Sequence, residues 1–74
     1  ERTRRQSVAR PRQVAMYLAT KMTPASLPDI GHRFGGFDHT TVIYARDRIA
    51  ELAGEDAKMR SELDSLERAI KREP

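Results

Sequence analysis

Residues 27–42 read LPDIGHRFGGFDHTTV and decide the fold. They predict a short helix that ends at Gly35-Gly36 and a longer helix that begins after Asp38. Ser26 is suited to cap the first helix, and Pro28 suits its first turn because the missing N–H would be unpaired there. Glycine adopts the left-handed backbone that ends a helix without steric cost. Two helices joined by such a tight turn indicate a helix-turn-helix.

Apolar residues recur at helical spacing on both sides of this stretch. A preceding helix is predicted from about Arg10 to Met22. The helix capped by Asp38 is predicted to end at Gly54, and a last helix to run from about Glu55 to Lys71. The predicted fold is all-α, a helix-turn-helix domain. The buried stripes are expected at Val14, Leu18 and Met22, at Leu27, Ile30 and Phe34, at Val42, Ala45, Ile49 and Leu52, and at Met59, Leu63, Leu66 and Ile70.

Positive charge is concentrated at the start of the chain. The 74 residues carry a formal net charge of +3. Six of the fourteen basic residues and only one of the eleven acidic residues lie in residues 1–21. We therefore predict a basic arm at residues 1–9 and the helix-turn-helix domain at residues 10–74. Such an arm is either a solvated tail or a contact for an anionic partner.

Several functional classes are disfavoured by the sequence. The chain has no cysteine, and the spacing of His32 and His39 is not one that zinc sites use. Gly35-Gly36 lacks the lysine of a phosphate-binding loop, and no serine lies in a nucleophile elbow. We expect no enzyme activity, metal or cofactor in this segment, and no membrane span. The start at Glu1, rather than at methionine, is typical of an excised segment.

The second helix of a helix-turn-helix presents its N-terminal residues to base edges in the major groove. Here those residues are Asp38, His39, Thr40 and Thr41, whose side chains carry hydrogen-bonding groups suited to bases. The alternative is that Asp38 only caps the helix and that the other three are ordinary surface residues. The stripe of the last helix packs within the domain, or forms a dimer seam or a docking face for a partner protein.

The chain also resembles a known family over most of residues 7–52. SVARPRQVAMYL at residues 7–18 and LPDIGHRFGGFDHTTV at residues 27–42 are similar to the C-terminal DNA-binding domain (domain IV) of DnaA, the bacterial chromosomal replication initiator. The run FGGxDHTTV is highly specific. The resemblance implies a small helical bundle of the Trp-repressor-like type that binds double-stranded DNA at DnaA boxes of the type TTATCCACA.

The resemblance also implies roles for individual residues. Asp38, His39 and Thr40 correspond to base-reading positions, and Leu27 and Pro28 to apolar base contacts. Arg4 corresponds to the arginine that enters the adjacent minor groove, with Arg5 or Arg2 as alternatives. The positions implied to approach the phosphate backbone are Arg5, Arg12, Gln13, Lys21, Thr41, Val42 and Arg48.

Phe37 departs from the family pattern, which usually has arginine there. The phenylalanine either packs in the turn or adds an exposed apolar contact. ATP is expected only if an ATPase domain precedes this segment. The resemblance implies a cytoplasmic, nucleoid-associated protein with regulators of replication initiation as possible partners. The chain is the tail of an initiator or a stand-alone DnaA-like regulator at the same sites. The alternative is a protein-interaction module that has lost DNA binding.

Overall fold

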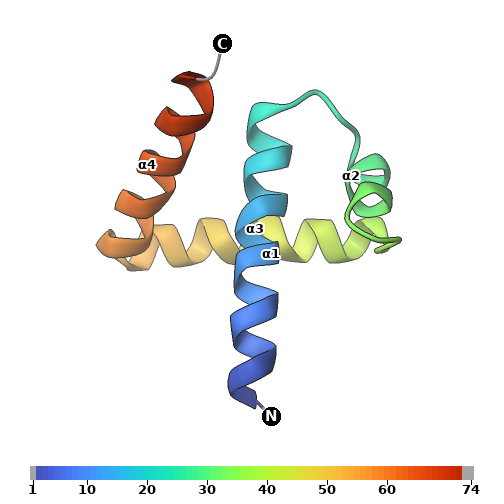
Figure 1. The fold of residues 1–74 in the computed structure, drawn as a ribbon, viewed down its shortest axis with the longest axis horizontal. Helices are drawn as coiled ribbons and strands as arrows, with labels where there is room; N and C mark the ends of the chain where they lie inside the picture. Colours follow the sequence, from blue (N-terminus) through green and yellow to red (C-terminus); the bar gives the residue numbers. More distant parts are fainter. Residues whose placement is uncertain (1, 73–74) are drawn as a thin grey trace.

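Four helices make up the part of the chain that the structure describes. The computed structural model describes residues 2–72, with side chains from residue 9 onward. The helices are α1 (Arg2–Met22), α2 (Leu27–Arg33), α3 (His39–Glu55) and α4 (Ala57–Arg72). Helix α3 packs against each of the other three, and α1 crosses it between α2 and α4 (Figure 1). The predicted all-α helix-turn-helix is confirmed.

The core lies where α1, α2 and α3 meet. Met16, Ile30, Val42 and Ala45 form one buried cluster, and Leu27, Phe34 and Phe37 pack against it. The predicted burial of Leu18, Ile49 and Leu63 is also confirmed. Met16 was not predicted, yet its side chain is 0% exposed. Val14, Met22, Leu52 and Met59 are only half-buried.

Helix α4 packs more loosely than its stripe predicted. Leu63 is buried, but the side chains of Leu66 and Ile70 are 43% and 46% exposed. The physical reason is that α4 has only α1 and the C-terminal part of α3 to pack against, so one apolar position enters the core. No helix within residues 2–72 is long and apolar enough to cross a membrane.

Both predicted N-caps of the helix-turn-helix are confirmed. Ser26 Oγ accepts a hydrogen bond of 3.2 Å from the backbone N–H of Asp29 at the start of α2. Asp38 Oδ2 accepts one of 3.1 Å from the N–H of Thr40 at the start of α3. Between the helices, Gly35 and Gly36 have φ values of +116° and +83°, which residues with a side chain rarely adopt. These features fix where the two helices begin and end.

Two helix boundaries differ from the predictions. Helix α1 begins at Arg2 rather than near Arg10 and contains Pro11. Residues 2–10 are mostly arginine, glutamine and alanine, whose helix propensity favours extension and opposes the cost of Pro11, which removes one backbone donor and crowds the carbonyl four residues earlier. Helix α3 continues through Gly54 to Glu55, because Asp56 rather than the glycine separates the last two helices. Asp56 Oδ1 accepts from the N–H of Lys58 at 3.0 Å, which caps α4.

Candidate nucleic-acid interface

The turn between α2 and α3 is held by a close backbone contact. The N–H of Phe37 donates a hydrogen bond of 2.9 Å to the carbonyl of Gly31. A Cβ atom added at Gly31 would fall well inside 3.0 Å of the Phe37 carbonyl oxygen, closer than real Cβ atoms come. Only glycine therefore lets the turn pack onto α2 in this way. The sequence signal that could have indicated this contact is a glycine inside a short helix, because a glycine at such a position usually allows close packing.

The first residues of α3 are exposed and polar. The side chains of Asp38 and His39 are 66% and 50% exposed, and Thr40 is exposed too. Asp38 Oδ2 accepts hydrogen bonds from both the hydroxyl and the backbone N–H of Thr40. These bonds, the hydroxyl first, lower the pKa of the Asp38 carboxyl below its ordinary value. Asp38 Oδ1 lies 3.7 Å from His39 Nδ1. The cap thus uses one carboxylate oxygen and keeps the other at the surface.

Helix α2 contributes the two predicted apolar contacts at its first turn. Pro28 is exposed, whereas Leu27 is half-buried and packs against the core cluster. Pro28 therefore offers the larger free apolar surface of the two.

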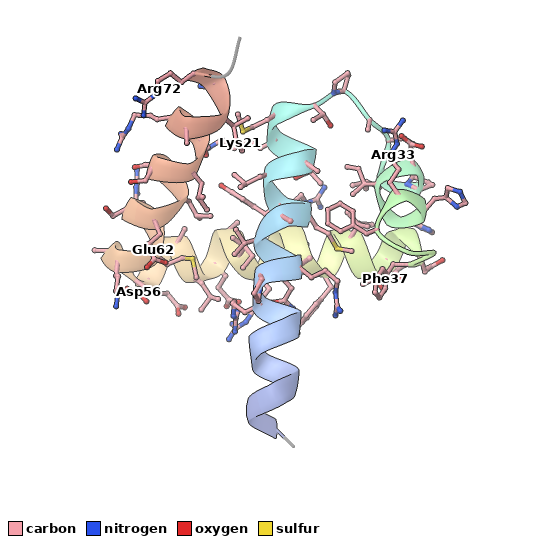
Figure 2. The ribbon with its side chains drawn as sticks, viewed as in Figure 1. Lys21, Arg33, Phe37, Asp56, Glu62 and Arg72 are labelled. Atoms are coloured by element: carbon pink, nitrogen blue, oxygen red, sulfur yellow. The ribbon has the colours of Figure 1, made fainter. Side chains whose placement is uncertain are left out.

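Phe37 packs in the turn, which was one of its two predicted roles. Its half-buried ring lies against the core cluster. The guanidinium carbon of Arg12, on α1, lies 4.7 Å from the centroid of this ring. Phe37 is labelled in Figure 2 beside the end of α2. The structure thus places Arg12, one of the predicted phosphate contacts, against the turn of the helix-turn-helix.

The other predicted backbone contacts have different surroundings. Gln13 Oε1 accepts from Arg10 Nη1 at 3.2 Å, and Arg48 Nη1 lies 3.0 Å from Glu51 Oε1. Thr41 is half-buried. The side chain of Val42 is 0% exposed within the core cluster, so it is unavailable to a phosphate.

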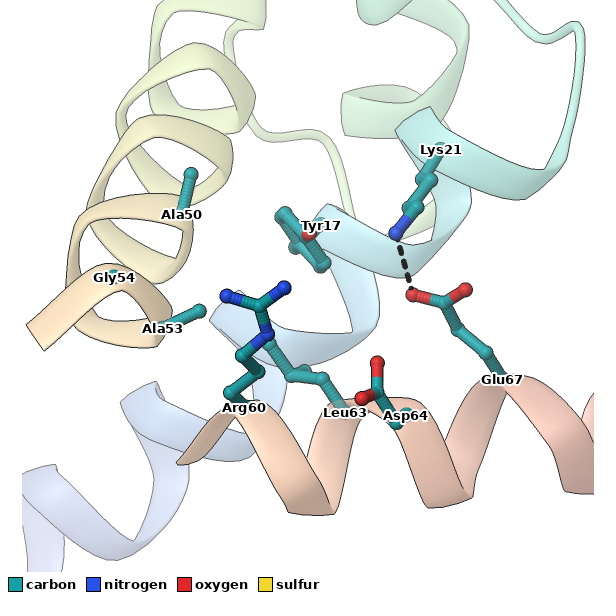
Figure 3. Close-up of a pocket in the computed structure, with 9 residues that line it drawn as sticks. All are labelled: Tyr17, Lys21, Ala50, Ala53, Gly54, Arg60, Leu63, Asp64 and Glu67. Carbon is teal, nitrogen blue, oxygen red and sulfur yellow. Dashed lines mark hydrogen bonds and ion pairs between the residues drawn. The ribbon is translucent and has the colours of Figure 1, made fainter. Parts of the chain in front are cut away.

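Lys21 lies apart from the other predicted contacts. Nine residues at 100° each place it on the opposite side of α1 from Arg12. Its Nζ lies 2.8 Å from Glu67 Oε2 on α4 (Figure 3). The hydrogen bond to Glu67, followed by the electrostatic interaction with Tyr17, raises the pKa of Lys21. The positive charge of Lys21 is therefore already balanced by the Glu67 carboxylate. The pair lies in a hollow lined by residues of α1, α3 and α4.

The side chains of Arg2, Arg4 and Arg5 lie outside the described residues, so the predicted minor-groove contact stays a prediction. The backbone there continues α1. Among the described side chains, no three potential metal ligands gather at one place.

The fold and the exposed first turn of α3 define a helix-turn-helix domain. Residues 1–49 match the family described as "Bacterial dnaA protein helix-turn-helix". The chain belongs to this family, as its motifs predicted.

Curated relatives agree with this assignment. The chain is 57% identical over 67 residues to the chromosomal replication initiator protein DnaA of Brucella abortus. The match covers 90% of this chain and 14% of that protein. The DnaA proteins of Mesorhizobium japonicum and Roseobacter denitrificans are 54% and 57% identical over 67 residues, with 90% of this chain and 14% and 15% of theirs covered. The chain thus spans about one seventh of the length of these relatives.

Proposed function

We propose that the chain binds double-stranded DNA sequence-specifically at DnaA-box-type sites, as in recognition of a chromosomal replication origin. The observation that carries this proposal is the first turn of α3. Its polar side chains are exposed, and the turn that precedes them is fixed by the contact between Gly31 and Phe37. Membership of the DnaA helix-turn-helix family supports the choice of this class of DNA site.

The hydrogen bonds of the first turn suggest how each residue reads a base. Asp38 Oδ1 is the oxygen that accepts from the amino group of a cytosine. The hydroxyl of Thr40 donates its hydrogen bond to Asp38, so its oxygen is left to accept one from a base. The Thr40 methyl group packs on a thymine methyl. His39 offers a ring N–H or a ring nitrogen to an adjacent base edge. Leu27 and Pro28 add apolar contacts.

Basic and polar groups outside this turn hold the phosphates. Arg12, Gln13, Thr41 and Arg48 remain the proposed backbone contacts, together with Arg5. Arg4 is the proposed minor-groove residue, since a narrow AT-rich groove attracts arginine. Lys21 is left out because it lies on the opposite side of α1 from Arg12 and pairs there with Glu67 of α4. The Val42 side chain is left out because it is buried.

The proposal is tested by titrating labelled duplexes that contain TTATCCACA or a scrambled sequence, at several salt concentrations. With about four positive charges brought to the DNA, by Arg4, Arg5, Arg12 and Arg48, log K should fall with log[salt] with a slope of about −3 to −4. His39→Ala should cost about 1–3 kcal/mol on the box and little on the scrambled duplex. A slope near zero, or equal affinity for both duplexes, would overturn the proposal.

The arm is tested separately with Arg4→Ala. We expect weaker binding and a relaxed preference at the AT-rich end of the box, because the arginine is proposed to lie in that minor groove. Binding equal to that of the unsubstituted chain would identify the arm as a solvated tail.

The second candidate function is a protein-interaction module without DNA binding. The exposed apolar side chains of Leu66 and Ile70 on α4 favour it. Phe37, which stands where the family usually has a cation, also favours it. A box titration of the unsubstituted chain beside Phe37→Arg separates the two. Binding by the variant alone would support the interaction module.

Two settings fit the proposed DNA binding. The chain acts as part of a replication initiator, or as a stand-alone DnaA-like regulator that competes for the same sites. Both place it on chromosomal DNA, in the nucleoid of the bacterial cytoplasm.

A further inference from the structure

The ring of Phe37 is held by the turn and by the buried cluster. Its backbone N–H is bonded to the Gly31 carbonyl at 2.9 Å, and its side chain packs against the buried cluster. One face of the ring meets the guanidinium group of Arg12, whose central carbon lies 4.7 Å from the ring centroid. A cation at this distance is attracted to the negative face of an aromatic ring.

The partner of the Arg12 guanidinium is this ring and not a carboxylate of the described residues. Lys21, Arg33, Arg46 and Arg48 each form an ion pair with a carboxylate. Among the ion pairs of the described residues, none involves Arg12. The guanidinium is held by a neutral ring instead, so its positive charge is not cancelled by a neighbouring acid.

The geometry of a guanidinium makes such support useful for binding an anion. The group is planar, and its N–H donors point outward in that plane. A guanidinium that meets a ring through its face keeps the donors at its edge free to bond. Arg12 Nε is buried and has no hydrogen-bond partner among the described residues. The residue as a whole is half-buried, so part of its surface remains accessible.

We propose that Phe37 is a positioning residue that holds Arg12 ready for a DNA phosphate. This inference rests on the proposed DNA binding. Without the ring, the long Arg12 side chain would have to be ordered when DNA binds, and that ordering would weaken the complex. Phe37 thus acts on affinity through Arg12 rather than by touching DNA.

The central variant is Phe37→Leu, which keeps an apolar side chain but removes the ring. Because ordering one long side chain costs about 0.5–1.5 kcal/mol, binding to the box should weaken about two- to tenfold. Phe37→Tyr keeps the ring face and should restore most of the affinity. Melting curves of both variants establish that each is folded at the assay temperature.

A double-mutant cycle with Arg12→Gln tests whether the two residues act together. If Phe37 acts through Arg12, Phe37→Leu should have almost no further effect in the Arg12→Gln chain. Equal losses in both backgrounds would overturn the positioning role while leaving DNA binding intact. An unsubstituted chain that binds no DNA would overturn the proposed function and this inference with it.

The free protein provides a readout that does not require DNA. Protons of the Arg12 side chain that lie over an aromatic face should resonate upfield of their ordinary NMR positions in the unsubstituted chain. These resonances should stay upfield in Phe37→Tyr and return to their ordinary positions in Phe37→Leu. Ordinary shifts in the unsubstituted chain would overturn the inference.

Discussion

Replacing Gly31 with alanine tests the contact on which the helix-turn-helix depends. The added methyl group would overlap the carbonyl oxygen of Phe37 and lie 3.1 Å from its carbonyl carbon. The obstacle is backbone, which cannot rotate away as a flexible side chain can. Relief requires α2 and the turn to separate, which stretches the 2.9 Å hydrogen bond from the Phe37 N–H.

The expected size follows from three opposing effects. Overpacking costs about 1–3 kcal/mol, and weakening the hydrogen bond adds about 1 kcal/mol. Alanine recovers about 1 kcal/mol because it is the better helix former. We therefore expect Gly31→Ala to lower the free energy of unfolding by about 2 kcal/mol. For a domain of this size, that corresponds to a Tm lower by roughly 10 °C.

Gly54→Ala is the matched control. Gly54 also lies within a helix, but an added Cβ there meets no atom within 4 Å. The same substitution should therefore raise the free energy of unfolding by about 0.5 kcal/mol. Urea unfolding followed by circular dichroism measures both variants. Equal effects of the two substitutions, or a Gly31→Ala variant as stable as the unsubstituted chain, would refute the reasoning.

Three further predictions concern α4, the cap of α3 and the hollow beside α1. Leu63→Ala should lower the free energy of unfolding by about 2–3 kcal/mol because the Leu63 side chain is buried. Leu66→Ala should lower it by under about 1 kcal/mol because the Leu66 side chain is 43% exposed. Similar losses for the two variants in urea unfolding would contradict this prediction. Thr40→Val should raise the pKa of Asp38 toward the ordinary value, since the Thr40 hydroxyl is the main cause of its lowering. The lowered pKa means that the carboxylate stabilises the fold above the ordinary aspartate pKa and loses this effect as the pH falls through the lowered one; an NMR titration in which the pKa does not move would count against the hydroxyl bond. Lys21→Gln should leave the salt dependence of DNA binding unchanged because the ammonium is paired with α4; a slope smaller by about 0.9 would instead place it on a phosphate.

Local chemistry explains which parts of the fold were predictable. Ser26 and Asp38 act within two or three residues of themselves, so their capping roles follow from the neighbouring sequence. The end of α3 was misplaced because glycine permits a helix to stop but does not require it. Asp56, whose carboxylate caps the following helix, supplies the actual break. Met16 was missed because it lies about 160° around α1 from Val14 and Leu18, on a second buried face that packs against Ile30 and Val42.

The candidate site was predictable as a set of residues more than as an arrangement. The motif indicated the first turn of α3, whose residues the structure exposes together. The contact between Arg12 and Phe37 joins residues 25 positions apart, and only the packing of α1 against the turn brings them together. The pairing of Lys21 with Glu67 is likewise a consequence of how α4 packs. Such contacts depend on tertiary structure and have no local sequence signal.

The close packing at Gly31 connects stability with the proposed DNA contact. The backbone of Phe37 is held by Gly31, its ring supports Arg12, and the next residue, Asp38, begins α3. A movement of the turn would therefore displace the phosphate-binding and base-reading groups together. For this reason a Gly31→Ala chain that remains folded should bind the box more weakly than its stability alone requires. The more stable Gly54→Ala chain, altered at the far end of α3, should bind as the unsubstituted chain does.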